Sequence, residues 1–271
     1  EILIGLVGSE MCIRDRAYAV PRLGDEETVD KLQALKVYTQ YRDLISTAPL
    51  EIIYSGSADL ERVKQALAAA FATLPREEVR VISTAAPHVC RESVQHVEDV
   101  LDVTQGKLGM GFSCGSDDMP ALLMGNTLFG GSSNSKLFLN VREKLSLCYY
   151  ASSLYHRQKG LITVSSGIEF QNYQRAYDEI MAQLEAVQKG ELEDWELEGA
   201  RSTLLNSYAT VGDSQGKLEN FYLGQAATGQ HETPADLARA IQDMTAERIC
   251  RAMSTVKLDT VYFLKGKEVE A

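Results

Sequence analysis

The chain has 271 residues, 45% hydrophobic and 24% charged, which are the proportions of a soluble globular protein with one large domain or two of moderate size. Its formal net charge of −11 argues against a nucleic-acid surface, which needs clustered Lys and Arg to meet phosphates. No apolar run approaches the ~20 residues of a membrane-spanning helix.

The first 16 residues, EILIGLVGSEMCIRDR, keep neither a helical nor a strand period and join abruptly to the segment that begins at Ala17. They resemble translated sequencing-adapter remnants, so we interpret residues 1–16 as an artefact or a disordered segment outside the fold. The alternative is a strand or loop whose partners lie upstream. Because the chain starts at Glu1 and not at methionine, we expect it to be a fragment.

Residues 17–75 show helix, strand and helix patterns in turn. Apolar positions at helical spacing predict a helix over 28–45, and LEIIYSG at 50–56 predicts a strand. A second helical stripe begins at Leu60 and is stopped by Pro75. Residues 76–95 keep no period, and we interpret them as an interdomain linker.

The next elements begin with KLGMGFSCG, in which apolar residues alternate with glycine and serine. This alternation predicts a half-buried strand whose glycine face allows close backbone approach. DDMPALLMGNTLFGG predicts a helix that ends just before Gly130. The helix after it is expected to bury Leu137, Val141 and Leu145.

The helices and strands predicted in the rest of the chain have clear boundaries in the sequence. HRQKG joins two predicted strands, 148–155 and 161–168, as a hairpin. Three helices are then predicted over 172–188, 194–210 and 214–228, followed by two short helices that begin after Thr233 and Thr245, and by a last strand, LDTVYFLKG.

Two helix–strand endings in this chain can be superposed. Four apolar helix positions match at an offset of 212 and three strand positions at 209: Leu32, Val37, Tyr41 and Leu44 on Met244, Ile249, Met253 and Val256, then Ile52, Ile53 and Tyr54 on Val261, Tyr262 and Phe263. The match predicts a duplicated fold. Residues 96–271 would hold one complete copy, and residues 17–75 the tail of a truncated first copy.

Signatures of metal binding and nucleophilic catalysis are missing from the sequence. His96 and Glu98 share a face of a short strand pattern but have no third ligand nearby, and His231 precedes a loop proline instead of forming HExxH. The five cysteines are scattered, with no CxxC pair. Such a set indicates reduced thiols and a cytoplasmic protein.

One stretch, LFGGSSNSKLFLNVREKLSLCYY at 128–150, brings a small polar loop, an arginine and two tyrosines close together. The guanidinium of Arg142 can bind a carbonyl or carboxylate through two hydrogen bonds, and a phenol such as Tyr149 can donate to an oxyanion. The alternative is that Arg142 is a solvated helix charge and Tyr149 a core residue.

Together with KGLITVSSGIE and two long helices, this stretch resembles the second homologous half of the insulinase-type (M16) zinc metallopeptidases, closest to the bacterial branch of short, two-half members. The resemblance runs from about residue 17 to the end. It implies an α+β fold, with a duplicated domain of mostly antiparallel sheet and packed helices. In the family the first half carries HxxEH and the zinc, whereas the second contributes an arginine and, seven residues later, a tyrosine.

That spacing falls on Arg142 and Tyr149, which the resemblance makes the catalytic candidates. It makes Gly130, Gly131, Ser132 and Ser133 the substrate-binding loop. The sequence departs from the family at Lys136, where many relatives have arginine, and at Cys148, where glycine or alanine is usual. The Tyr149-Tyr150 doublet leaves open which tyrosine faces the cleft.

The implied function is the substrate-binding, transition-state-supporting half of a zinc peptidase that acts on peptides. The chain itself would hold no cofactor, and zinc would lie in a missing N-terminal half or in a partner chain. One alternative is an inactive partner subunit that binds peptide and pairs with a zinc-bearing chain; another is a structural core subunit. Expected partners are a peptide and either a second copy or a zinc-bearing M16 chain, without nucleic acid or membrane.

Overall fold

A computed structural model of the chain describes residues 26–80 and 93–267. The segment 1–16 and most of the predicted linker therefore lie outside the described residues. The described residues form two compact units, one with 93–209 and 232–267 and the other with 26–80 and 210–231.

The larger unit is built on a five-stranded sheet in the order β1-β5-β2-β4-β3. Its strands are β1 (Gln95–Leu101), β2 (Gly106–Cys114), β3 (Cys148–His156), β4 (Leu161–Ile168) and β5 (Val256–Gly266). All neighbouring pairs are antiparallel except β1 and β5, which run parallel. The predicted α+β class with a mostly antiparallel sheet is confirmed.

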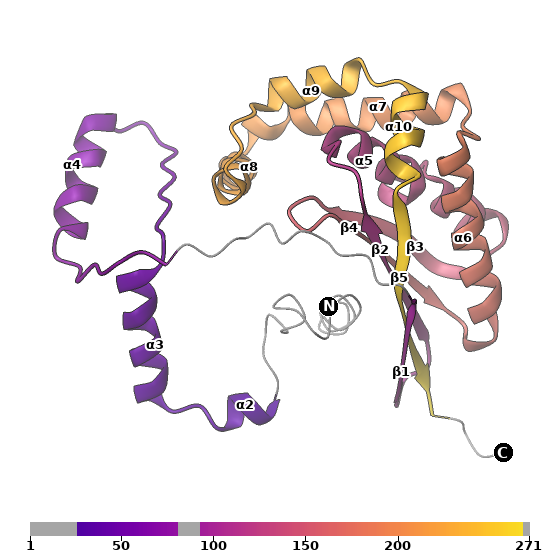
Figure 1. The fold of residues 1–271 in the computed structure, drawn as a ribbon, viewed down its shortest axis with the longest axis horizontal. Helices are drawn as coiled ribbons and strands as arrows, with labels where there is room; N and C mark the ends of the chain where they lie inside the picture. Colours follow the sequence, from indigo (N-terminus) through magenta and orange to yellow (C-terminus); the bar gives the residue numbers. More distant parts are fainter. Residues whose placement is uncertain (1–25, 81–92, 268–271) are drawn as a thin grey trace. The chain divides into compact units, whose positions relative to one another are not determined.

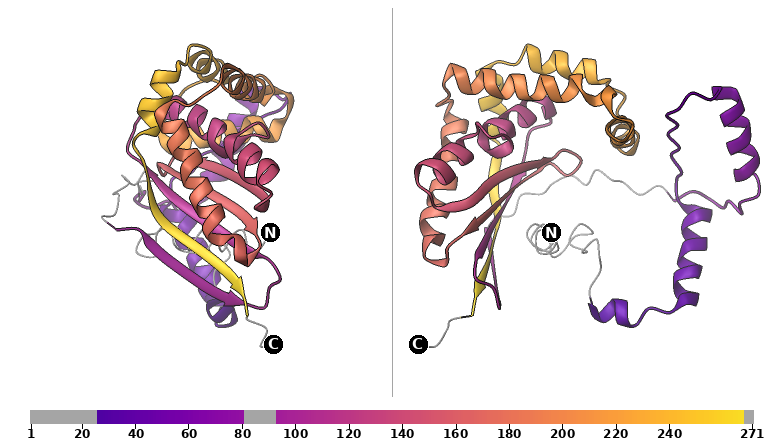
Figure 2. Two further views of the ribbon diagram at one scale, coloured as in Figure 1. Left: turned by 90° about the vertical axis from the view of Figure 1, so that its right-hand side faces the viewer. Right: turned by 180° about the vertical axis from the view of Figure 1, so that it is seen from behind.

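The helices of this unit pack on the sheet and on one another. They are α5 (Met119–Asn126), α6 (Tyr173–Lys189), α7 (Asp194–Ala209), α9 (Pro234–Gln242) and α10 (Ala246–Met253), with a short 3-10 turn, Phe170–Asn172, before α6. Helices α7 and α9 lie side by side (Figure 1), and α10 packs against both α5 and α6. The views in Figure 2 show the twisted sheet with α6 lying along it.

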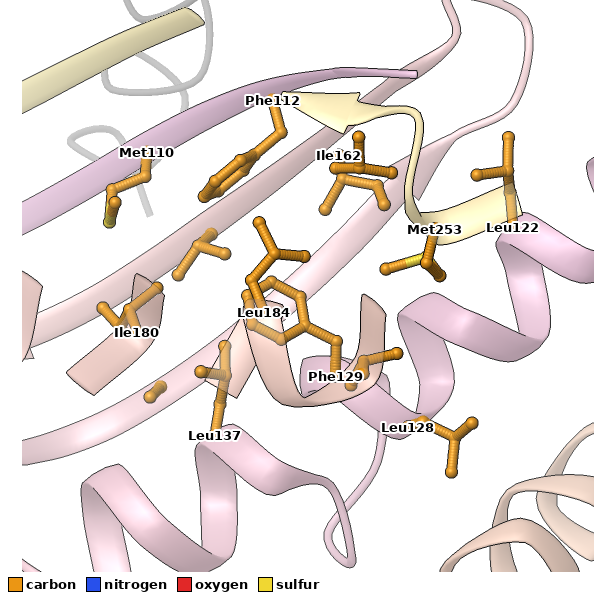
Figure 3. Packing of buried hydrophobic residues seen from close by; sticks show 14 of the residues in the cluster. Met110, Phe112, Leu122, Leu128, Phe129, Leu137, Ile162, Ile180, Leu184 and Met253 are labelled. Carbon is orange, nitrogen blue, oxygen red and sulfur yellow. The ribbon is translucent and has the colours of Figure 1, made fainter. Parts of the chain in front are cut away.

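The core lies between one face of the sheet and helices α5, α6 and α10. Met110 and Phe112 of β2 belong to one buried cluster with Ile180 of α6 and Met253 of α10, and all four are fully buried (Figure 3). The rings of Phe112 and Phe129 form an edge-to-face pair with centroids 6.2 Å apart. Such a pair adds about 1 kcal/mol to the burial of its area.

Local sequence signals explain where most helices begin and end. Thr233 forms a capping box with Asp236 at the start of α9, and Thr245 caps α10 by accepting a hydrogen bond from the Arg248 amide. Gly190 follows α6 with φ +78°, in the left-handed region that favours glycine. These predicted boundaries are confirmed.

The two helices around the glycine pair differ from the prediction. Residues Thr127–Gly131 and Leu137–Lys144 (η2 and η3 below) wind as π-helix, with hydrogen bonds from residue i+5 back to residue i. The wider turn shifts the apolar stripe, so that Leu137 and Val141 are buried but Leu145 is exposed. The prediction of Leu145 as a core residue is wrong, and Leu147 is buried instead.

The smaller unit contains four α-helices among its described residues: α2 (Glu26–Asp30), α3 (Ala34–Thr47), α4 (Leu60–Phe71) and α8 (Gln215–Thr228), with a 3-10 turn at Val211–Asp213. The single helix predicted over 28–45 is broken after Asp30. The strand predicted over 50–56 is wrong, because these residues pair with no strand in the described part of the chain. Arg76 secures the end of α3, donating from Nη2 to the carbonyl of Ala48 at 2.7 Å.

Two further findings concern the described residues alone. Cys114, Cys148 and Cys250 are free thiols. Within residues 26–80 and 93–267, no helix has the length and apolar character needed to cross a bilayer.

Candidate functional site

Arg142 occupies the central position among the predicted site residues. It lies near the end of η3, and its guanidinium carbon is 4.6 Å from the centroid of the Phe138 ring, in a cation–π contact. Its Nη1 is 3.5 Å from Oε1 of Glu143. The side chain is 40% exposed and lines two hollows in the surface, so it is accessible to a ligand in either.

The first hollow, called the Tyr149 hollow below, has a volume of about 440 Å³. Residues from η3, the following turn, β3 and the segment before α6 line it: Arg142, Glu143, Ser146, Leu147, Cys148, Tyr149, Glu169 and Asn172. Tyr149 is 65% exposed, which excludes the alternative that it is a core residue. Ser146 has φ +49°, a left-handed conformation that is costly for a residue with a side chain.

The second hollow, called the glycine-loop hollow, has a volume of about 390 Å³. The four predicted loop residues line it together with parts of η3 and β3: Gly130, Gly131, Ser132, Ser133, Phe138, Arg142, Tyr150, Ala151, Ser152 and Ser153. The structure therefore brings all six predicted site residues to two hollows that share Arg142.

Gly130 and Gly131 belong to the last turn of η2 and not to a loop. A Cβ on Gly130 would lie 2.7 Å from both Cδ1 of Leu137 and the backbone nitrogen of Ser153, and one on Gly131 would lie 2.9 Å from Nδ2 of Asn126. Gly130 thus allows η2 to approach η3 and β3 closely, whereas Gly131 leaves room for Asn126. Ser132 and Ser133, which are at least partly exposed, are the polar residues left to meet a ligand.

A β-bulge between Cys148 and Tyr150 separates the two tyrosines. Tyr150 is held against the sheet: a Cβ on Gly167 would meet its ring at 2.6 Å, its hydroxyl is 3.3 Å from Oγ of Ser165, and Nζ of Lys107 lies 5.1 Å from its ring centroid. Tyr149 has no strand partner in the register and stays exposed. Simple alternation, which would let only one tyrosine face the site, therefore does not hold, and each lines a different hollow.

A buried ion pair anchors the turn between η2 and η3. Nζ of Lys136 lies 3.0 Å from both carboxylate oxygens of Glu196 in α7, and both residues are less than 10% exposed. Glu196 also accepts a hydrogen bond from the backbone N–H of Glu193. Sequence reasoning noted Lys136 only as a departure from the family. Its partner lies 60 residues away, and no local signal connects the two.

The Cys148 thiol in the Tyr149 hollow is not an activated nucleophile. Burial raises its pKa, and the opposing effect of the Arg142 charge does not reverse the shift. The thiol therefore stays protonated at neutral pH, whereas the thiolate is the reactive form.

A zinc ion does not fit the described residues. Within residues 26–80 and 93–267, no three His, Cys, Asp or Glu side chains are close enough together to hold a metal ion. His96 and Glu98 both lie on β1, but Glu98 pairs with Nζ of Lys265 at 2.6 Å. The described residues therefore contain no candidate set of three metal ligands.

Comparison with known proteins shows which protein family this chain resembles. The profile described as "Peptidase M16 inactive domain" matches residues 31–204. The chain is 37% identical over 266 residues to "Probable inactive metalloprotease YmfF" of Bacillus subtilis, covering 96% of this chain and 61% of that protein. It is 23% identical over 154 residues to "Uncharacterized zinc protease YmxG" of the same organism, covering 55% of this chain and 38% of that protein. The chain thus spans less than two thirds of either relative.

Solved structures show the same fold. A conserved protein from Enterococcus faecalis has a TM-score of 0.84 and 25% identity, with 98% of this chain and 64% of that one covered. A peptidase M16 inactive domain from Pseudomonas fluorescens has a TM-score of 0.78 and 16% identity, with 99% of this chain and 66% of that one covered.

Proposed function

The chain belongs to the M16 peptidase family and matches the inactive domain of that family, and on this premise we propose that it binds peptides at Arg142, Tyr149 and the Gly130–Ser133 turn. The observation that supports this proposal most is that Arg142 lines two adjoining hollows, with Tyr149 on one and the glycine turn on the other. An extended peptide that crosses Arg142 would meet all three features.

The proposed chemistry is positioning and transition-state support, not metal-based activation. The Arg142 guanidinium would bind a peptide carbonyl through two hydrogen bonds, held in place by the Phe138 ring below it. The exposed Tyr149 hydroxyl would donate to the oxyanion that forms when a peptide carbonyl is attacked. The hydrolytic zinc would be supplied from outside the described residues.

We propose two sources for that zinc. In the first, an upstream part of the same polypeptide carries it, and this chain completes the site. In the second, the protein is an inactive subunit that binds peptide and pairs with a zinc-bearing M16 chain in the cytoplasm; the name of the Bacillus subtilis relative, a probable inactive metalloprotease, favours this one. The first source is compatible with a homodimer, and the second requires a heterodimer with the zinc-bearing chain.

The domain division belongs to the same proposal. Residues 17–75 would be the tail of a first M16-like domain, 76–95 a linker and 96–271 a second domain. The repeated helix–strand pattern supports this division, although the family match from 31 to 204 runs across the linker.

The test uses the full-length protein, or this chain mixed with a zinc-bearing M16 chain, and follows cleavage of a fluorogenic peptide. Tyr149→Phe removes one exposed hydroxyl and should lower kcat about 10²-fold with little change in KM or Tm. Arg142→Lys keeps the charge but loses the bidentate geometry, and should lower kcat/KM.

Tyr150→Phe is the matched control. It loses the contact with Ser165 and should leave kcat near the wild-type value. If Tyr149→Phe kept full activity while Tyr150→Phe lost it, the assignment of the two tyrosines would be reversed. If no variant changed either activity or peptide affinity, the structural-subunit alternative would stand in place of this proposal.

A further inference from the structure

The two hollows that share Arg142 differ in charge. The Tyr149 hollow contains two carboxylates, Glu143 and Glu169, and one cation, Arg142. The glycine-loop hollow contains Arg142 as its single charged residue, among glycine, serine, alanine and aromatic side chains. The first hollow is therefore net negative, whereas the second carries no carboxylate.

The negative charge that is left over in the Tyr149 hollow lies on Glu169. The positive charge of Arg142 is partly compensated by Glu143, whose Oε1 lies 3.5 Å from Nη1 of Arg142. Glu169 is exposed and accepts a hydrogen bond from Nε2 of Gln171 at 2.9 Å, but within residues 26–80 and 93–267 no cationic group forms an ion pair with it. A carboxylate without a cation partner in a hollow can bind a positively charged ligand group at little desolvation cost.

The remaining walls of the Tyr149 hollow suit a long basic side chain. The Tyr149 ring is exposed and can take a cation–π contact. Leu147 and Cys148 offer apolar surface, against which the methylene groups of lysine or arginine can pack while the charged end stays in water.

We propose that the Tyr149 hollow is a specificity pocket for a basic side chain of the bound peptide, with the lysine or arginine cation facing Glu169. The inference rests on the proposed peptide-binding function and adds the chemical class of the residue that is recognised. The glycine-loop hollow, which has no carboxylate, would receive a neutral side chain of the same peptide.

The test measures binding of fluorescein-labelled nine-residue peptides to the 271-residue chain by fluorescence anisotropy. One central position is varied among Lys, Arg, Met and Glu in an otherwise uncharged sequence. Lys and Arg peptides should bind about 5- to 10-fold more tightly than the Met peptide, since an exposed ion pair and a cation–π contact each add a modest gain, and the Glu peptide should bind most weakly.

Glu169→Gln should reduce the preference for Lys over Met to less than about 2-fold, chiefly by weakening the binding of the Lys peptide. Glu185→Gln, on the exposed side of α6, is the matched control, because it changes the net charge by the same amount away from the hollow. The Glu185→Gln variant should keep the preference for Lys over Met. This result would separate a local effect of Glu169 from attraction by the net charge of −11.

Four results would count against the inference. Equal binding of the Lys and Met peptides, or a preference that survives Glu169→Gln, would overturn the specificity pocket and leave the proposed function intact. A preference lost equally in Glu169→Gln and Glu185→Gln would show attraction by net charge only. Failure of every peptide to bind would overturn the proposed function, and the pocket with it.

Discussion

The helix–strand ending of the larger unit and its counterpart near the start of the chain have the same apolar pattern but opposite exposure. Ile249 of α10 is 0% exposed, whereas Val37 of α3, the matching position, is 51% exposed. The same contrast holds between Phe263 of β5 and Tyr54. A local pattern is therefore enough to form the helix but not to bury it.

The difference follows from the neighbours that each region has. Strand β5 lies between β1 and β2, and α10 packs on α5 and α6. Residues 51–54 pair with no strand among the described residues. A strand is defined by its neighbours, so the same apolar triplet forms a central strand in one place and an exposed segment in the other. The proposal that residues 17–75 belong to a longer first domain would supply the missing neighbours.

Hydrogen exchange should show the largest difference between the two regions. Amides of residues 261–263 lie in a strand with partners on both sides, and should exchange at least about 10³-fold more slowly than unstructured amides. Amides of residues 52–54 should exchange close to the unprotected rate. Mass spectrometry of peptic peptides measures both in one experiment, and strong protection of 52–54 would mean that these residues do have strand partners.

Truncation of the matched helix positions should give the next largest difference. Ile249→Ala leaves a cavity in the core and should lower the free energy of unfolding by about 2 to 5 kcal/mol. Val37→Ala removes exposed methyl groups and should change it by less than about 0.5 kcal/mol. Urea unfolding followed by far-UV circular dichroism and by fluorescence of Trp195, the one tryptophan, measures both.

The Val37→Ala variant can also be tested in the full-length protein, where upstream residues would be present. If upstream residues cover α3, Val37→Ala in the full-length protein should cost about 1 kcal/mol or more, because a buried methyl group would then be lost. An unchanged free energy of unfolding there would mean that the face of α3 remains exposed and that the duplicated-domain proposal is wrong.

The smallest expected difference between the two units is in the contribution of one ion pair to the free energy of unfolding. Arg248 donates two hydrogen bonds to Asp118, at 2.7 and 3.0 Å, and these lower the pKa of Asp118 below its ordinary value of 3.8. The stabilisation is therefore present above about pH 4 and is lost as the pH falls through the lowered pKa. Asp118→Asn can still cap α5, and should cost at most about 1 kcal/mol at pH 6 and progressively less as the pH falls below about 4.

Asp43→Asn tests the same kind of pair in the smaller unit, where Asp43 lies 3.4 Å from Arg80 in an exposed pair. This variant should change the free energy of unfolding little at either pH, because an exposed pair is weak. If Asp118→Asn and Asp43→Asn lowered the free energy of unfolding equally at pH 6, the two ion pairs would not differ in strength.

The sequence by itself determined the local features of the protein and its family. Gly190, Thr233 and Thr245 act on their own backbone or on residues within one turn, so their effect is the same in any surroundings. The strand β2 and the hairpin from β3 to β4 were predicted for the same reason, but the expectation that β2 is half-buried is wrong, because residues on both of its faces are buried. The stretch 128–150, together with KGLITVSSGIE and the two long helices, resembled the M16 family closely enough to indicate it, whereas the six site residues stay a prediction.

The tertiary structure alone decided which of these residues are accessible and what holds them. The wide turns of η3 exposed Leu145 and buried Leu147, and the bulge in β3 left Tyr149 free while Tyr150 packs on Gly167. Glu196 meets Lys136 only because α7 packs beside the turn. Each of these outcomes depends on packing between segments far apart in the chain, and a pattern read along one segment contains no information about its neighbours.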